Sequence, residues 1–188
     1  MTATWEVLPN KTLARIGELN ATMIGAPPFS GEDQKFGEQI MKSMGIEVKE
    51  PPFDTTIAHA DLSRTFPNID ISKASTDVGN VSWMLPTLTF SVATKAKGTP
   101  QHSWLMVSQT NSPPAMKGGL TASKWMVASA LDCLIHPEII SDAWEKHKKC
   151  LAQNIFYHPI LNDVKVPGFK DLYGIEPAHI PILPAGDE

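Results

Sequence analysis

The chain has 188 residues, of which 42% are hydrophobic and 19% are charged, and its formal net charge is −4. These values are ordinary for a soluble globular protein with one sizeable core. The negative charge and the lack of a Lys/Arg run argue against nucleic-acid binding, because phosphate contacts need clustered positive charge. No apolar run reaches the roughly 20 residues that a bilayer span requires, so we expect no membrane association.

The two cysteines indicate the redox compartment. Cys133 and Cys150 are the only ones, and they lack the Cys-x-x-Cys spacing of a zinc or redox site. No secretion signal stands at the N-terminus, since a charged segment followed by an apolar one is missing there. A cytoplasmic, reduced protein is the simplest inference.

Two helices joined by a proline turn are expected first. Asn10 is a good N-cap, and apolar residues follow it at three- and four-residue spacing as far as Gly25. Ser30 and Asp33 then form an approximate capping box, and a second apolar stripe continues to Gly45. The pattern predicts a helical hairpin.

An irregular stretch and one strand are expected next. Residues 46–73 are broken by prolines and have no sustained period, which favours a loop-rich connection. Residues 87–94 alternate, with Leu88, Phe90 and Val92 on one face. This period of two is the clearest strand signal in the chain.

Two further helices are expected in the C-terminal half. The first runs from Ala115 to Leu134 and has small residues near its start that permit close packing. Pro137 suits the first position of the second helix. The apolar face expected to bury the first helix consists of Met116, Leu120, Val127, Leu131 and Leu134.

Helices therefore dominate, with few strands and no internal repeat. We expect one domain over residues 1–175. Residues 176–188 are rich in proline and lack periodicity, so we expect an extended or disordered tail there.

Two sequence blocks carry the clearest functional signal. Residues 74–83 read Ala-Ser-Thr-Asp-Val-Gly-Asn-Val-Ser-Trp, and residues 98–104 read Gly-Thr-Pro-Gln-His-Ser-Trp. They resemble the C-terminal part of dizinc amidohydrolases of the aminobenzoyl-glutamate utilization protein B type, within the aminoacylase and carboxypeptidase family. Shorter matches extend the resemblance over residues 8–167, and they lie at residues 10–13, 24–27, 117–120 and 163–167.

The resemblance implies a fold and a set of roles. The fold would be α/β, the C-terminal half of a zinc-exopeptidase-like catalytic domain, helix-rich with few strands and without the lid or dimerisation domain. His102 would be a metal ligand, and Ser75, Thr76, Asp77 and Thr99 would line the substrate pocket. The complete enzyme would use a divalent metal, zinc or manganese, and a small-molecule amide substrate.

The residues themselves support some of these roles and leave others open. His102 lies in a turn directly after the expected strand, and such loops commonly carry functional groups. Imidazole is also the commonest zinc ligand near neutral pH. Asp77 fits a polar pocket residue or a helix N-cap, and the two roles can coexist. Trp104 fits either a wall that excludes solvent or a core contact.

Other histidines are weaker candidates. His59 and Asp61 imitate a His-x-Asp ligand motif, but they lie in the irregular connection without the flanking Gly-His context, so we reject them. His147 stands between Lys146 and Lys148, which favours a solvated helix face.

The family chemistry needs more ligands than this sequence offers. A dizinc hydrolase uses about five ligands and a Glu general base, whereas this chain has no Glu-Glu pair and one credible ligand. The first hypothesis is part of a metal-dependent amidohydrolase that cleaves p-aminobenzoyl-glutamate or a related N-acyl amino acid by metal-activated water. A missing N-terminal segment or subunit would complete it, and the chain alone would bind no metal tightly. The alternative is an inactive remnant or a partner-binding domain that uses an exposed sheet edge.

Overall fold

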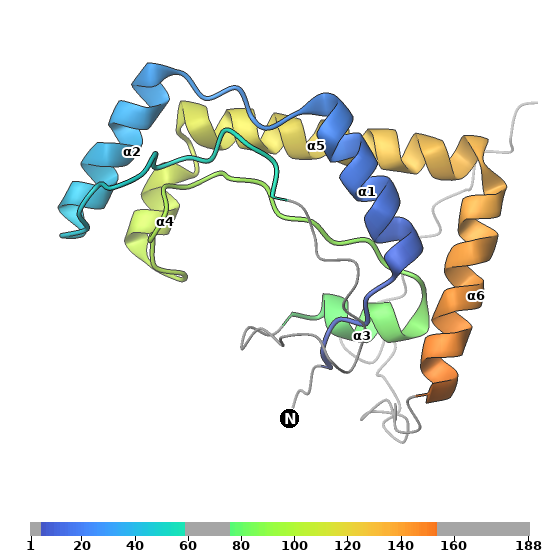
Figure 1. Ribbon diagram of the computed structural model, residues 1–188. Helices are drawn as coiled ribbons and strands as arrows, with labels where there is room; N and C mark the ends of the chain where they lie inside the picture. The colour runs from blue at the N-terminus through green and yellow to red at the C-terminus, as the bar shows by residue number, and fades with distance from the viewer. Residues whose placement is uncertain (1–4, 59–75, 154–188) are drawn as a thin grey trace, which may run out of the picture. The chain divides into compact units, whose positions relative to one another are not determined.

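Figure 1 shows the computed structural model, which describes residues 5–58 and 76–153. All regular elements in these ranges are α-helices, so the expected α/β class with a few strands is wrong. The described residues belong to one compact unit, and the boundary expected at residue 175 lies outside them. None of the described helices is long and apolar enough to cross a membrane. The helices are α1 (Lys11–Ile24), α2 (Gly31–Ser43), α3 (Val78–Met84), α4 (Trp104–Gln109), α5 (Pro113–Ile135) and α6 (Pro137–Gln153).

The helix starts follow the capping chemistry that the sequence predicts. The Asn10 side chain accepts a hydrogen bond from the Leu13 N–H at 3.2 Å, which satisfies one of the unpaired donors at the start of α1. The capping box of Ser30 and Asp33 is confirmed at the start of α2. Pro137 begins α6, as expected.

Helices α1, α5 and α6 pack together, because α1 contacts both α5 and α6, and these two contact each other. Buried polar side chains fix the pairing. The Asn10 amide donates to the Ala143 carbonyl of α6 at 2.9 Å. Asn20 in α1 donates to the Asp132 carboxylate of α5 at 2.6 Å. Hydrogen bonds to a charged group are stronger than neutral ones, so this contact defines how α1 lies along α5.

The expected strand at residues 87–94 is an extended segment without strand pairing among the described residues. Its alternation is real, since Leu88 and Phe90 are half-buried and Thr89 is exposed. Leu88 packs against Gly17 of α1, where an added Cβ would come within 3.0 Å of Leu88 Cδ1. The apolar face therefore packs on helices. The sheet edge expected to bind a partner is not a feature of the described residues.

The expected packing face of α5 is also wrong. Its buried residues are Pro114, Gly118, Thr121, Trp125 and Ser129, and all five predicted apolar residues are exposed. The reason is a close approach of backbone, because a Cβ at Gly118 would lie 2.2 Å from the Ala93 carbonyl oxygen. Such a close approach requires a residue without a side chain at this position of the helix.

A second, smaller core joins α2 to the irregular residues that follow it. Met41 and Phe53 are buried together, and the Phe29 and Phe53 rings lie 4.8 Å apart. The Gln34 amide group both donates to the Phe53 carbonyl at 3.0 Å and accepts from its N–H at 3.1 Å. These two hydrogen bonds satisfy the backbone N–H and carbonyl of Phe53, which lies in no helix or strand.

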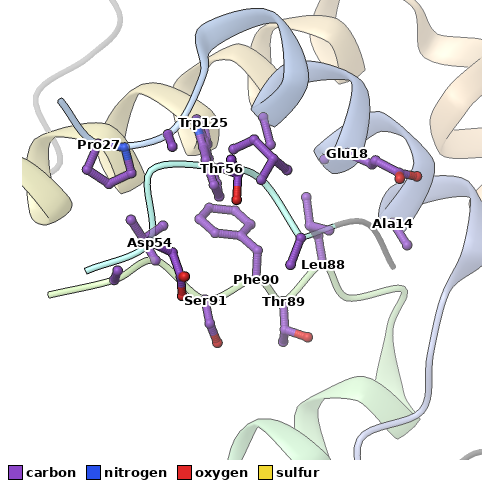
Figure 2. Close-up of a pocket in the computed structure, with 17 residues that line it drawn as sticks. Ala14, Glu18, Pro27, Asp54, Thr56, Leu88, Thr89, Phe90, Ser91 and Trp125 are labelled. Atoms are coloured by element: carbon purple, nitrogen blue, oxygen red, sulfur yellow. The ribbon is translucent and has the colours of Figure 1, made fainter. Parts of the chain in front are cut away.

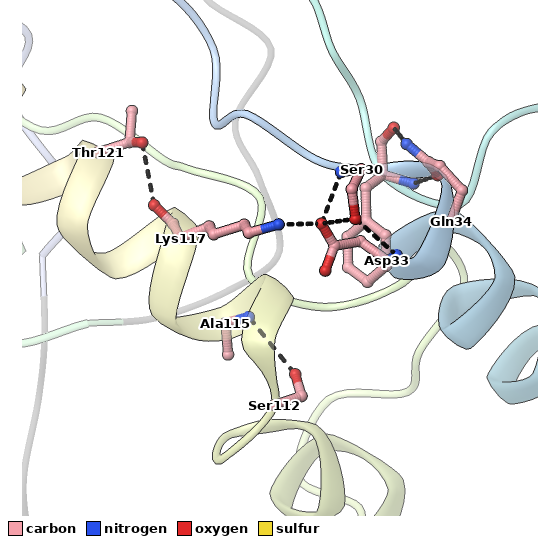
Figure 3. Close-up of polar contacts among 8 residues, drawn as sticks. Ser30, Asp33, Gln34, Ser112, Ala115, Lys117 and Thr121 are labelled. Carbon is pink, nitrogen blue, oxygen red and sulfur yellow. Dashed lines mark hydrogen bonds and ion pairs between the residues drawn. The ribbon is translucent and has the colours of Figure 1, made fainter.

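A charged contact links α2 to α5 (Figure 3). The Lys117 ammonium donates to the Asp33 carboxylate, which also accepts from the Ser30 N–H at 2.6 Å. Burial alone raises the pKa of Asp33, but the hydrogen bonds from Lys117 and Ser30 outweigh it and hold the pKa below its ordinary value. Asp33 thus serves both the α2 cap and the interhelical pair.

His147 is buried, at 3% exposure, and the expectation of a solvated face is wrong for it. Its ring lies edge-on to Trp144 at 5.6 Å. The neighbouring lysines do point to solvent, since Lys149 pairs with Glu145 on the exposed side of α6. The charge run therefore identifies one face of α6 correctly, and His147 lies on another.

Candidate functional site

The residue predicted to bind metal lies in a short loop, residues 95–103, which we call the His102 loop. Its conformation depends on Gln109, which is 1% exposed and lies at the end of α4. The side-chain Oε1 of Gln109 accepts from the Ala96 N–H at 2.8 Å, and its side-chain NH₂ group donates to the Thr99 hydroxyl at 3.1 Å. The same amide also donates to the Leu105 carbonyl at 2.9 Å. One side chain therefore pairs polar groups at three points around the loop.

His102 has the left-handed backbone conformation, with φ of 54°, and it is the one non-glycine residue of the described chain with positive φ. This region is costly for residues with a Cβ, although His tolerates it better than most. The side chain is exposed. The next residue, Ser103, caps α4 by accepting from the Met106 N–H at 3.3 Å and donates to the Pro100 carbonyl at 2.8 Å. His102 therefore lies between Pro100 and Ser103, which this hydrogen bond joins.

The loop is also held from the outside. Gly98 has φ of 74°, and an added Cβ there would lie 2.6 Å from Ile46 Cδ1. Lys97 contacts the Asp54 carboxylate at 2.7 Å and the Glu50 carboxylate at 2.8 Å. Hydrogen bonds to Asp54 and then to Glu50 raise the pKa of Lys97. The loop is therefore attached to the segment that follows α2.

Of the predicted pocket residues, Thr99 lies in the His102 loop, and no hydrogen bond between described residues joins Thr76 or Asp77 to that loop. Thr99 is buried, and its hydroxyl donates to the Ala96 carbonyl at 2.6 Å, so it supports the loop from within. Thr76 and Asp77 stand at the start of α3, where Asp77 makes no side-chain capping bond. Ser75 lies outside the described residues, as do His59 and Asp61.

The rest of the first sequence block has a packing role. An added Cβ at Gly79 would lie 1.7 Å from the Trp5 carbonyl oxygen. Asn80 accepts from the Trp5 N–H at 3.0 Å, and the buried Ser82 hydroxyl accepts from the Leu8 N–H at 2.8 Å. Trp83 donates its ring N–H to the Glu6 carbonyl at 2.9 Å. These residues hold the segment that precedes α1 against α3.

Trp104 and Val107 border His102 on α4. Trp104 is 74% exposed and Val107 is exposed as well, so neither forms a core contact of the described chain. Together they expose apolar surface on the first turn of α4, the helix that follows the His102 loop. Of the two roles left open for Trp104, the core contact does not agree with its exposure, and the solvent-excluding wall stays a prediction.

A cavity of about 400 Å³ lies elsewhere, between α1, α5 and the two extended segments 54–58 and 88–93 (Figure 2). Its lining is largely apolar, with Phe90 and Trp125 among the residues that face it. Of the two carboxylates in its lining, Asp54 is paired with Lys97. No His or Cys lines this cavity, and its two carboxylates belong to no group of three described side chains that could hold a metal ion.

The donor chemistry of the described residues fits one position of a metal site. No three His, Cys, Asp or Glu side chains in residues 5–58 and 76–153 lie close enough to hold an ion. Catalytic zinc sites use three protein ligands and an open position. His102 supplies one imidazole, so no catalytic step is assigned to these residues alone.

Comparison with known proteins finds a distant relative in Escherichia coli (strain K12). The chain is 25% identical over 175 residues to the B subunit of p-aminobenzoyl-glutamate hydrolase from that bacterium. The match covers 84% of this chain and 36% of that protein, so the chain spans about a third of its relative's length. No family model matches the chain, and no solved structure matches it.

This chain is a distant homologue of that hydrolase. The finding confirms the predicted relation to aminobenzoyl-glutamate hydrolases at that level. The metal-ligand role of His102 and the pocket roles of Ser75, Thr76, Asp77 and Thr99 stay predictions. Sequence reasoning missed Gln109, whose polar side chain in a short apolar helix was the available signal.

Proposed function

We propose that this chain acts as part of a metal-dependent amidohydrolase that cleaves the amide bond of p-aminobenzoyl-glutamate or a related N-acyl amino acid. Its contribution is His102, as one ligand of a divalent zinc or manganese ion. The observation that supports this role is the left-handed backbone of His102 in a loop held by Gln109 and Ser103. The distant homology to the Escherichia coli hydrolase supports the substrate class.

The left-handed backbone of His102 is informative because the loop keeps this conformation despite its cost. A left-handed residue with a Cβ costs about 1–2 kcal/mol relative to a right-handed one, and glycine avoids most of that cost. Strained residues of this kind gather at active sites and ligand clamps. An exposed imidazole kept at such a position, where glycine is better for stability, supports a functional role for the side chain.

The remaining ligands and the general base would come from a second polypeptide. In this proposal it resembles the part of the Escherichia coli hydrolase that the chain does not match. The exposed Trp104 and Val107 on α4, the helix that follows the His102 loop, offer an apolar contact for it. Without that polypeptide, we expect no amide hydrolysis and no tight metal binding.

Reconstitution tests the proposal. The chain is mixed with a polypeptide that carries the unmatched segment from a closely related hydrolase, and binding and p-aminobenzoate release are measured separately with zinc or manganese. We expect activity in the mixture only. His102→Ala should reduce it by at least the roughly 10–100-fold that loss of a residue supporting a metal ligand causes. The matched control is His136→Ala, since His136 is exposed and contacts Glu138 at 3.2 Å.

A second variant separates ligand loss from misfolding. His102→Gly removes the imidazole and also relieves the left-handed strain, so the free energy of unfolding should stay constant or rise by up to about 1 kcal/mol. The complex should form and be inactive. If the complex forms and His102→Gly retains full activity, His102 is not a metal ligand.

A further inference from the structure

The outer face of α5 is apolar along its whole length. Its large residues are 49–78% exposed, although they belong to the longest described helix. Lys124 is the one charged residue among the exposed positions of α5. At about 100° per residue, this face lies about 180° from the buried face of Gly118, Thr121, Trp125 and Ser129. Packing against α1 therefore leaves it uncovered, and such a patch marks an interaction site. The exposed large residues along it are Met116, Leu120, Val127, Leu131 and Leu134.

The face has the spacing of a coiled-coil seam. Leu120, Val127 and Leu134 follow one another at seven-residue intervals. A second set of residues also repeats every seven positions, and each member lies four residues before a member of the first set. This is the spacing of the a and d positions of a heptad. The members of the second set are smaller on average, and they are Met116, Ser123 and Ala130.

We propose that α5 pairs with α5 of a second copy of this chain, in antiparallel orientation. An antiparallel pairing centred on residue 125 puts Leu120 opposite Ala130 of the second copy and Val127 opposite Ser123. Each of these layers joins a large residue to a small one, so the side chains interdigitate at interior packing density. Met116 and Leu134 meet at both ends of the seam.

The same residues disfavour a parallel pairing. In a parallel coiled coil each residue meets its own copy, so Ser123 would face Ser123 and Ala130 would face Ala130. Two layers of small residues would leave cavities, which cost stability in proportion to their volume. The Ser123 hydroxyl donates to the Gly119 carbonyl at 3.0 Å, so the antiparallel seam buries no unpaired donor there.

The expected dimer is weak and reversible. A helix of 23 residues is about 34 Å long and offers about three heptads. That is the lower limit for a seam, and we expect a dissociation constant on the order of 10 μM. The two-fold axis places Lys124 of both copies on the same flank. Salt screens this repulsion and strengthens apolar burial, so association should tighten as salt rises.

Sedimentation velocity of the full chain over a concentration series tests the pairing. Leu120→Lys puts a charge in the seam at a position that is 60% exposed in the single chain. Its matched control is Leu19→Lys on α1, where the leucine is 57% exposed. We expect the unaltered chain and Leu19→Lys to dimerise, and Leu120→Lys to associate at least about tenfold more weakly.

Disulfide trapping tests the orientation in a chain whose native cysteines, Cys133 and Cys150, are replaced by alanine. The pair Ser123→Cys with Val127→Cys should form a covalent dimer on oxidation, whereas Ser123→Cys alone should not. Efficient trapping by Ser123→Cys alone would mean a parallel seam. A chain that stays monomeric at all concentrations, or one whose dimer survives Leu120→Lys, would overturn the proposal. None of these readouts depends on the proposed hydrolase activity.

Discussion

Gln109 supports the candidate site through three side-chain hydrogen bonds, although it contributes no chemistry there. Its amide group satisfies a buried N–H, a hydroxyl and a carbonyl of the surrounding chain. Removing one partner of a buried hydrogen bond costs the full desolvation of the group left behind. The position of His102 therefore depends on a neutral side chain seven residues away.

Replacing Gln109 with alanine should loosen the His102 loop. The Ala96 N–H, itself buried, would lose its partner, so we expect about 2 kcal/mol of destabilisation and faster amide exchange at Ala96. Ser108→Ala is the matched control, because its exposed hydroxyl bonds only the Leu105 carbonyl. Urea unfolding and hydrogen exchange measure both effects. Unchanged protection of the Ala96 amide would show that Gln109 does not hold the loop.

Among the elements, helix starts were predictable from the sequence and packing faces were not. Asn10, Ser30 and Pro137 act locally, through hydrogen bonds or a fixed φ within one turn, so short motifs identify them. The buried face of α5 depends instead on how closely Gly118 approaches the Ala93 carbonyl, which is a tertiary contact.

The predicted strand failed for a related reason. Its period of two correctly separated Leu88 and Phe90 from Thr89, but a strand also needs a neighbour, and helices occupy that place in the described chain. The candidate site was predicted in part. The resemblance pointed to His102, whose ligand role stays a prediction, whereas the loop contacts of Thr99 and Gln109 connect residues whose proximity no local pattern encodes.

The Lys117 and Asp33 pair connects two elements, and its loss should be measurable. Lys117→Met would leave the buried Asp33 carboxylate without its cation, for a loss of about 2 kcal/mol at pH 7, between exposed and fully buried pairs. The pKa of Asp33 is lowered in the native state, so its contribution is present above the unfolded pKa of about 4 and is lost as pH falls through the native value.

The effect of Lys117→Met should therefore be smaller at pH 3 than at pH 7, as measured by urea unfolding. The control is Lys42→Met, since Lys42 and Glu38 form an exposed pair at 3.9 Å within one helix. That change should alter stability by less than about 0.5 kcal/mol. Equal losses for the two variants would mean that the interhelical pair has no special weight.

At the scale of the whole described unit, contacts between distant segments join α3 and α6 to the rest. The residues before α1 hold α3 through the hydrogen bonds of Asn80 and Ser82. Asn10 and Thr12 bond to α6, the latter at 2.6 Å to Asp142. His147 adds a further contact, because its ring lies on α6 and hydrogen-bonds the Trp83 backbone of α3. A change in the charge of His147 therefore acts on how these segments pack.

Acid should weaken this packing through His147. Burial lowers the pKa of His147, more than the hydrogen bond to the Trp83 backbone raises it, and its Nε2 has no hydrogen-bond partner in the described chain. The unfolded chain, with a histidine pKa of about 6.5, then binds the proton more readily than the native one. The stability from neutral His147 is fully present above that value and declines as pH falls below it.

Urea unfolding at pH 8 and pH 5.5 should thus show a loss in the unaltered chain that is much smaller in His147→Gln, which cannot be charged. His136→Gln is the control, because His136 is exposed and should leave the loss intact. Carboxyl side chains ordinarily titrate below this pH range and histidines titrate within it, so histidine titration should dominate the difference. An equal loss in His147→Gln would place the acid sensitivity elsewhere in the chain, and α6 would then meet α3 without dependence on the protonation of His147.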